Sequence, residues 1–400
     1  LLRHPPAAGG AEEDPAAPPA AWDRAVAGAE LNVAVALARL GWAPAFVTAL
    51  PDSELGDEVA GLLREALGAA RGGLVLRRAA GKVGTVHITA TSKVYQREDS
   101  VFSQLDAAWF GEGFWRDALA VGPEEVHRPA GGLTFLHMSG VPPLLAPSPA
   151  RAWAAALTSA QRAKAAGQRV VVTMELTPRS EFGGYLELWM MTMPHLGSLD
   201  VLVLSLNILA PLCTLLGDRS SPQLRRLDAL RPALVGLDGV AAQRLPDDLR
   251  SLEAVDALLA DALRELRRVL PAGGARPALL VTAKLLEGKR PAPGAAPSQK
   301  RWSLACDGER VVSTAACWVQ HKPLVTEGGA DAWLAGVIDG LAASEAERDA
   351  GGAGGAAAGE AMDVSGPFAL QVDAGTWAAA LRRGDRLAAM KQDTSRHSSD

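Results

Sequence analysis

The sequence predicts an α/β protein in which a mainly parallel sheet is covered by helices on both faces. Four apolar runs favour buried strands, at 134–139, 169–176, 200–205 and 278–284, and helical patterns separate most of them. The chain has 400 residues, of which 48% are hydrophobic, and that is enough to bury the core of one large domain. We therefore expect a single domain over residues 1–400.

The elements that precede these strands can be predicted in the same way. Residues 5–21 are rich in Pro and Ala, which predicts an irregular loop. From Glu30 onward, apolar residues recur at helical spacing and predict a buried helix that ends at Gly41. A short buried strand at 45–50 follows, and then a second amphipathic helix over about 54–63.

In residues 81–106, apolar and polar residues alternate, and Val, Thr and Ile are frequent. This pattern is typical of exposed antiparallel strands, and we expect it to form a small β-strand lid inserted in the domain. Surface insertions are predicted at 287–300, which is Pro-rich and polar, and at 343–362, which is low in complexity. The glycines of 343–362 match no phosphate-loop pattern, so we expect a flexible linker there.

Net charge and cysteine spacing argue against several classes of protein. The formal net charge is −5 and Lys and Arg form no repeating cluster, so neither a nucleic-acid nor a membrane partner is expected. Cys213, Cys306 and Cys317 form no Cys-x-x-Cys pair, which predicts buried free thiols in a reducing compartment rather than disulfides or a zinc site. The uncharged stretch 201–217 is short for a membrane span. The sequence begins at Leu1 and not at Met, so it gives no basis for judging a targeting signal.

The clearest chemical feature is the segment 326–341, TEGGADAWLAGVIDGL. Gly328 and Gly329 precede a predicted helix whose first turn holds Asp331. Backbone N–H groups of glycines can converge on an anion there, the helix dipole adds positive charge, and a nearby carboxylate can act as a general base. Ordinary helix capping by Gly and Asp gives the same pattern, so both interpretations stay open at this point.

This segment resembles the C-terminal signature of the ribokinase/PfkB carbohydrate kinases, Asp-Thr-x-Gly-Ala-Gly-Asp-x-Phe. Thr326, Gly328 and Asp331 match the signature, whereas Ala330 replaces its second Gly. The resemblance implies a ribokinase-like three-layer sandwich, phosphoryl transfer from ATP with Mg²⁺, and Asp331 as the catalytic base. It also implies an anion hole formed by the amides of Gly328, Gly329 and Ala330.

A second match lies near the start of the chain. AGAELNVAVALARLG at 27–41 resembles the family signature that contacts sugar hydroxyls, so Gly28 and Asn32 inherit that role. PDSELG at 51–56 continues the match, which covers nearly the whole chain. The resemblance implies a first strand before LLRHPP that this sequence does not include.

Three segments are similar to the 2-keto-3-deoxygluconate kinase branch of the family: LHMSGVPPLL at 136–145, MELTPR at 174–179 and AAMKQDTSRHSSD at 388–400. This similarity implies that Arg179 binds a substrate carboxylate, for which a planar guanidinium is well suited. The lid keeps Arg97, but Phe102 and Gln104 stand where the branch has Tyr and Arg. We expect these four side chains to line the substrate site.

Residues that contact ATP are predicted from the strand at 278–284. Thr282 and Lys284 lie at its end, and such sheets bind ligands at the ends of their strands. A solvated loop is the alternative for both residues. Asn207 and Thr326 are further candidates for contact with ATP, although Ala210 stands where the family has an acid that helps organise magnesium.

The sequence therefore predicts an ATP-dependent kinase for a hydroxyl of a small sugar or sugar acid, first of all 2-keto-3-deoxygluconate. A non-catalytic PfkB-like binding or assembly protein is one alternative, which the motif departures favour. A kinase for a neutral sugar or nucleoside is another, which Phe102 and Gln104 favour. The exposed strands of the lid also predict a homodimer formed through the lid.

Overall fold

The computed structural model describes residues 2–4, 23–68, 73–88, 93–120, 133–176, 185–216, 222, 227, 230–235, 239–270, 276–287, 298–320, 329–355, 368, 370 and 372–394. The irregular loop predicted at 5–21 lies outside these ranges. None of the helices within them is long and apolar enough to cross a bilayer.

A nine-stranded sheet forms the centre of the molecule, with a main path in the order β10-β11-β12-β9-β8-β7. Strands β7, β8, β9, β12 and β11 run parallel, whereas β10 and β13 run antiparallel to their neighbours and β13 also pairs with β14 and β15. Their bounds are β7 Thr134–Ser139, β8 Val170–Leu176, β9 Val201–Leu204, β10 Leu234–Val235, β11 Gly239–Ala241, β12 Ala278–Glu287, β13 Ser298–Asp307, β14 Arg310–Ser313 and β15 Cys317–Gln320. The four predicted apolar strands are all present in this sheet.

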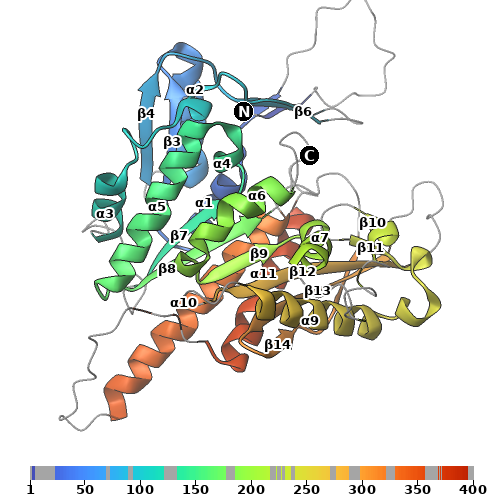
Figure 1. Cartoon of the computed structure of the whole chain (residues 1–400). Coiled ribbons are helices and arrows are strands. Elements are labelled where there is room, and N and C mark those ends of the chain that lie inside the picture. The colour runs from blue at the N-terminus through green and yellow to red at the C-terminus, as the bar shows by residue number, and fades with distance from the viewer. Residues whose placement is uncertain are drawn as a thin grey trace, which may run out of the picture.

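Alternate residues of the buried strands face two different layers of helices, so the fold is a three-layer sandwich (Figure 1). In β9, Leu202 and Leu204 pack with α5, α6, α7 and α9, whereas Val201 and Val203 pack with α1, α10 and α11. The helices are α5 Pro147–Ala165, α6 Tyr185–Thr192, α7 Leu206–Leu216 and α9 Leu252–Val269 on one face, and α1 Ala29–Arg39, α10 Gly329–Gly355 and α11 Ala374–Thr394 on the other. The predicted α/β architecture with a mainly parallel sheet is confirmed.

Short helical elements connect these layers. They are α3 Glu112–Ala120, α4 Pro142–Leu145, η3 Met193–Ser198, η4 Arg231–Ala233, η5 Ala242–Arg244 and η6 Asp247–Leu249. Helix α1 ends where the sequence predicts, because Gly41 adopts a φ of 97°, a left-handed conformation that glycine tolerates without strain.

A separate parallel pair of strands, β3 (Ala45–Pro51) and β4 (Gly73–Ala79), stands beside the large sheet (Figure 1). Helix α2 (Glu54–Leu67) connects the two strands, and the Ser53 hydroxyl caps it by accepting the Gly56 N–H at 3.2 Å. Apolar side chains of α1, α2, β3 and β4 form a small core of their own. Among the described strands, neither β3 nor β4 is hydrogen-bonded to the nine-stranded sheet, so side-chain packing joins the two bodies.

A four-stranded sheet in the order β2-β1-β5-β6 contains the strands of the predicted lid, and we refer to this sheet as the lid. Strands β5 (Thr85–Ile88) and β6 (Lys93–Gln96) come from the segment predicted to be the lid, and β1 (Leu2–His4) and β2 (Asp23–Ala25) join them from the N-terminal part of the chain. In Figure 1 this sheet lies above the carboxyl ends of the central strands.

The prediction of lid strands throughout 81–106 is wrong at its end, because Val101–Gln104 form the 3₁₀ helix η1. The Ser100 hydroxyl caps this turn by accepting the Ser103 N–H at 3.2 Å. Val101 is fully buried in an apolar cluster with Ala49 and Ala152. A capped turn that is anchored in a core cannot continue the pairing of an exposed sheet.

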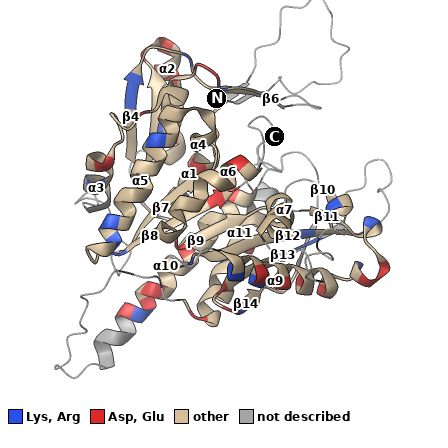
Figure 2. Ribbon diagram, in the orientation of Figure 1, with Lys and Arg blue, Asp and Glu red and all other residues tan. Residues whose placement is uncertain are grey.

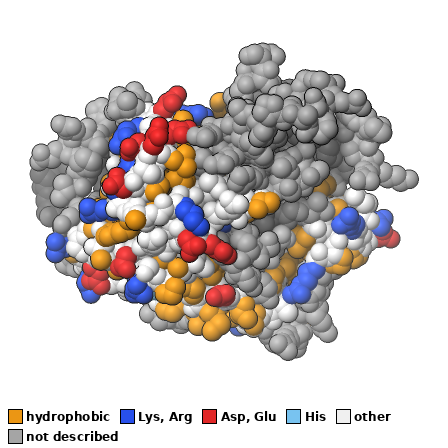
Figure 3. All heavy atoms as spheres, turned by 90° about the horizontal axis from the view of Figure 1, so that it is seen from above, with side chains coloured by type: hydrophobic (Ala, Val, Ile, Leu, Met, Phe, Trp, Pro, Cys, Tyr) orange, Lys and Arg blue, Asp and Glu red, His pale blue; other side chains and the backbone are white. Residues whose placement is uncertain are grey.

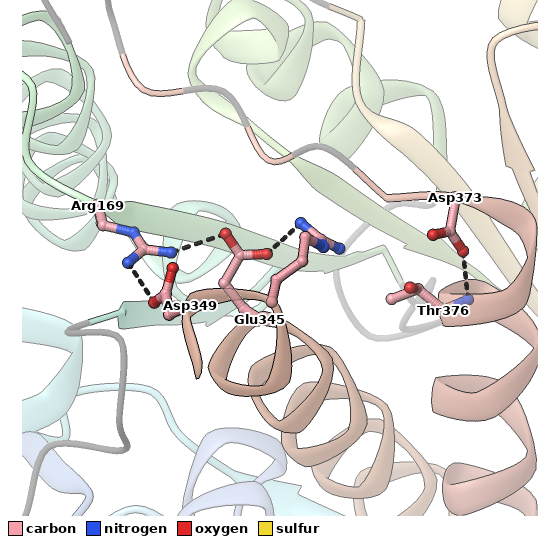
Figure 4. A network of polar contacts seen from close by, with 6 residues as sticks. Arg169, Glu345, Asp349, Asp373 and Thr376 are labelled. Atoms are coloured by element: carbon pink, nitrogen blue, oxygen red, sulfur yellow. Dashed lines mark hydrogen bonds and ion pairs between the residues drawn. The ribbon is translucent and has the colours of Figure 1, made fainter. Parts of the chain in front are cut away.

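The linker predicted at 343–362 is wrong for 343–355, because α10 continues as a helix to Gly355, and 356–362 lie outside the described residues. Alanine-rich sequence favours helix, and Arg169, next to β8, fixes this part of α10 by donating to Glu345 at 2.7 Å and to Asp349 at 2.8 Å (Figure 4). Acidic and basic residues follow one another along this far part of α10 (Figure 2). At the ends of the insertion predicted at 287–300, Glu287 belongs to β12 and β13 begins at Ser298, while 288–297 lie outside the described residues.

Two of the three cysteines have the buried environment that the sequence predicts. Cys213 and Cys306 are free thiols. Burial raises the pKa of Cys306 to about 11 and raises the pKa of Cys213 as well. Both thiols are therefore protonated at neutral pH, which makes them weak nucleophiles and assigns them to packing.

Charged side chains of both signs are interspersed on the face seen from above (Figure 3). Mixed charges largely cancel one another beyond about one Debye length of roughly 8–10 Å. The described part of this face therefore has no strong field of a single sign, and recognition of a charged ligand there depends on individual side chains.

Candidate active site

Asp331 lies in the first turn of α10, and its carboxylate accepts a hydrogen bond from the Asn32 amide of α1. The distance between Asn32 Nδ2 and Asp331 Oδ2 is 2.7 Å, although the two residues are 299 positions apart in the sequence. A charge-assisted bond of this kind fixes the orientation of the carboxylate, which lies at the positive end of the helix dipole. The fold thus brings together the residues that carry the two sequence signatures.

The position of this pair follows from Glu30, two residues before Asn32 in the first turn of α1. The Glu30 carboxylate accepts hydrogen bonds from Ser139, the last residue of β7. Strand β7 runs parallel to β8, β9 and β12, so the first turn of α1 lies at the edge where all four strands reach their carboxyl ends. Ligands of open α/β sheets bind at this edge.

A second contact aligns α1 with α10. The indole N–H of Trp42, just after α1, donates to Asp339 at 2.9 Å, and Arg383 of α11 forms an ion pair with the same carboxylate. Asn32 and Trp42 therefore contact Asp331 and Asp339 in the same order, so α1 and α10 run in parallel. Two contacts along the helices hold Asp331 more firmly than one contact would.

The candidate anion hole differs from the prediction in one respect, because Gly329 is the first residue of α10 instead of preceding it, and Ala330 follows it within the helix. The first four N–H groups of a helix have no acceptor within the helix, so these two amides can donate to a ligand. Ala330 is not among the residues with positive φ, so the replacement of Gly by Ala causes no backbone strain there. Gly328 and Thr326 lie outside the described residues.

The candidate nucleotide residues Asn207 and Thr282 lie at the same edge of the sheet. Leu204, the last residue of β9, pairs with Val281, so Thr282 is the first residue of β12 beyond the end of β9. Asn207 is in the first turn of α7, directly after β9. Lys284 pairs with Gly239 of β11 and with Arg301 of β13. Thr282 and Lys284 were predicted at a strand end, but β12 continues to Glu287 because β13 pairs with it along its length.

The candidate substrate residues fall in three places. Gly28 precedes α1 and its carbonyl accepts the Asn32 N–H at 2.8 Å. Arg97 follows β6 of the lid, with its guanidinium 4.2 Å from the centre of the Tyr95 ring. Phe102 packs against the apolar cluster beneath η1, and Gln104 is exposed, so neither extends from a lid strand as predicted. Arg179 lies outside the described residues.

His137 of β7 is half-buried, with its ring nitrogen Nε2 fully buried. Its Nδ1 lies 3.1 Å from Thr173 Oγ1, and its Nε2 has no hydrogen-bond partner within the described part of the chain. Burial lowers the pKa of His137 below its ordinary value of 6.5, and the nearby Glu30 and Glu175 only partly oppose this effect. His137 is therefore neutral at pH 7, in line with a structural role.

This pKa predicts that the protein loses stability in mild acid. Below pH 6.5 the unfolded chain binds a proton at His137 that the folded chain does not bind. The free energy of unfolding should therefore fall as the pH decreases from 6.5 toward the lowered pKa, by at most about 1.4 kcal/mol per pH unit for this group. Urea unfolding at pH 7.5, 6.5 and 5.5 measures this slope, and His137→Asn should make it shallower. An identical slope in the variant would contradict the assignment. His195, whose pKa burial also lowers, accounts for part of the remaining slope.

The fold of the chain matches that of solved sugar kinases over nearly its whole length. The 2-dehydro-3-deoxygluconokinase of Thermotoga maritima has a TM-score of 0.57 at 18% identity, covering 98% of this chain and 89% of that chain. The chain has the ribokinase-like fold. No known family model matches the sequence.

Two further structures with the ribokinase-like fold carry other substrates in their names. The aminoimidazole riboside kinase of Salmonella enterica, solved with aminoimidazole riboside and an ATP analogue, has a TM-score of 0.51 at 15% identity, covering 98% of this chain and 90% of that one. The fructokinase of Xylella fastidiosa has a TM-score of 0.51 at 17% identity, covering 97% and 88%. At identities this low, the similarity between the structures establishes the fold and leaves the substrate open.

In this ribokinase-like chain, sequence reasoning missed the contacts of Glu30 and Trp42. An acid in the first turn of a helix is ordinarily explained by the helix dipole, and nothing in the local sequence indicates that Glu30 reaches Ser139. The signal that was available is the position of Glu30 between Gly28 and Asn32, inside the segment that resembles the family's sugar-contacting signature.

Proposed function

We propose that the chain is an ATP-dependent sugar kinase that phosphorylates a hydroxyl of a small sugar or sugar acid. The observation that carries the proposal is the bond from Asn32 to Asp331 at the carboxyl edge of the sheet. It supports a carboxylate held in a fixed orientation at the start of a helix, where a general base for phosphoryl transfer is needed. The names of the structures with similar folds support the same class of reaction.

Asp331 acts as the general base in this proposal. Its carboxylate takes the proton of the substrate hydroxyl as the oxygen attacks the terminal phosphorus of ATP. The new oxygen–phosphorus bond forms while the bond from phosphorus to the bridging oxygen breaks, and ADP leaves with that electron pair. Asn32 keeps the carboxylate oriented toward the hydroxyl, which lowers the entropic cost of reaching the reactive geometry.

The amides of Gly329 and Ala330 would stabilise the charge on the transferred group, together with the positive end of the α10 dipole. Mg²⁺, bound with ATP, would neutralise charge on the phosphates. Within the described ranges no three His, Cys, Asp or Glu side chains gather into a metal cage. Magnesium in such reactions usually keeps several waters and binds through phosphate oxygens.

The first candidate for the substrate is 2-keto-3-deoxygluconate. The segments at 136–145, 174–179 and 388–400 support it, because they resemble the branch that acts on this sugar acid. Arg97 stacked on Tyr95 supplies a cation to the lid, which would close over a carboxylate. Phe102, packed in a core cluster, and exposed Gln104 keep a neutral sugar as the second candidate.

Formation of ADP by the purified chain with Mg²⁺ and ATP tests this proposal. The acceptors are 2-keto-3-deoxygluconate, fructose, ribose and a nucleoside, each beside a reaction without acceptor. We expect ADP formation that depends on one acceptor, led by the sugar acid. Turnover of fructose or the nucleoside alone would identify a kinase for neutral substrates. A folded chain that binds no ATP and consumes none would favour the binding or assembly protein.

A further inference from the structure

Glu30 ties the first turn of α1 to the end of β7 through a single carboxylate oxygen. Glu30 Oε1 lies 2.5 Å from the Ser139 hydroxyl oxygen and 3.1 Å from the Ser139 backbone nitrogen, and both groups donate to it. The two residues are 109 positions apart. This contact joins two elements that the chain connects only through the lid, the β3–β4 pair and α3.

Ser139 is a firm anchor because the strand end around it is held on several sides. Strand β7 pairs with β8 as far as Ser139 and Glu175, and the next amide, of Gly140, donates to the Glu175 carbonyl at 3.0 Å. A Cβ at Gly140 would lie 2.6 Å from Leu188 of α6, so the chain after Ser139 has little room to move. Ser139 itself is buried.

We infer that Glu30 is a positioning residue for the proposed catalytic base, acting through α1. Its carboxylate sets the rotation and height of the first turn of α1 against β7. Asn32, in that same turn, then reaches Asp331 at hydrogen-bond distance. The chain of contacts runs from Ser139 to Glu30, along α1 to Asn32, and on to Asp331. This inference rests on the proposed function only where it predicts a change in rate.

Substitutions at Glu30 can separate the effect of its hydrogen-bond geometry from the effect of its charge. Because both donors contact the same oxygen of Glu30, the amide oxygen of Gln can accept both bonds, whereas Ala can accept neither. His137, on which both Glu30 and Glu175 act electrostatically, is neutral at pH 7 because burial lowers its pKa. A neutral Gln therefore leaves no buried cation unpaired at His137, and geometry decides the outcome.

The experiment compares Glu30→Gln and Glu30→Ala with the wild-type chain. With the acceptor that the wild type uses, we expect Glu30→Ala to lower kcat at least tenfold, with the KM for ATP within twofold. We expect Glu30→Gln to retain kcat within threefold. Ser139→Ala, which removes only the hydroxyl donor, should fall between them. A purely structural role would lower Tm in Glu30→Ala but leave the kcat of the folded enzyme unchanged, and that result would overturn the inference.

A second measurement needs no activity. If Glu30 positions Asn32, the bond to Asp331 is already weakened in Glu30→Ala, so Asn32→Ala should cost less there than in the wild-type chain. Side chains two positions apart on a helix do not contact each other, so any coupling runs through the backbone and the partners. We expect the unfolding equilibrium constants to depart from multiplicative behaviour by at least threefold. Agreement within twofold would overturn the inference. A wild-type chain without kinase activity but with this coupling would refute the proposed function and keep the positioning role.

Discussion

Replacement of Asp331 by asparagine should lower kcat by about a hundred- to ten-thousand-fold, the usual effect of losing a general base. The asparagine side chain has nearly the same shape as aspartate, and its oxygen can still accept the bond from Asn32, so the fold should persist. The KM for ATP should change little, because the nucleotide is expected to contact other residues. Steady-state kinetics with the best acceptor, together with a thermal melt, measure both properties.

Asp339 provides a matched control on the same helix. It lies two turns beyond Asp331 and is bonded to Trp42 and Arg383 instead of facing the candidate site. Asp339→Asn should therefore lower Tm while the folded enzyme keeps kcat within about threefold, since the group takes no part in proton transfer. If the two variants lost the same fraction of kcat, Asp331 would have no special role as a base.

A large loss of stability is expected for Gly336→Ala in α10. A Cβ at Gly336 would lie 2.7 Å from the Cα of Gly384 and 2.8 Å from the carbonyl oxygen of Arg383, both on the backbone of α11. Backbone atoms cannot rotate away, so the two helices would have to separate. Overpacking of this kind typically costs about 1–3 kcal/mol of unfolding free energy. Urea unfolding with linear extrapolation measures the loss.

Gly61→Ala in α2 is the opposite case. No atom lies within 4 Å of a Cβ at Gly61, which is exposed in the middle of the helix. The change from Gly to Ala should therefore increase the free energy of unfolding by up to about 1 kcal/mol through helix propensity alone. Equal destabilisation by the two variants would mean that the close contact between α10 and α11 does not decide the outcome at Gly336.

The strands of the central sheet could be predicted from the sequence because each is a short apolar run that helical patterns flank. Strand β7 has the predicted bounds, Thr134–Ser139. The prediction that Asp331 is in the first turn of a helix is also confirmed, since Gly and Asp before an apolar stripe are a local signal. Local signals of this kind do not depend on the rest of the fold.

Features that depend on distant partners could not be predicted in this way. The segment 343–355 looks like a linker by composition, yet it is helical because Arg169 pairs with Glu345 and Asp349 from another layer. Phe102 lies in a segment with the alternation of a strand, yet the burial of Val101 fixes it as a turn. The contact between Glu30 and Ser139 likewise requires two elements that only the tertiary fold brings together.

The isolation of the β3–β4 pair has a consequence for how the molecule unfolds. A body with its own small core, joined to the large sheet by side-chain packing, can open as a separate cooperative unit. Its backbone amide hydrogens would then exchange with deuterated solvent through a local opening. Those of β8, β9 and β12 would exchange only through global unfolding. Because α1 packs against both bodies, each such opening would also disturb the helix that carries Asn32.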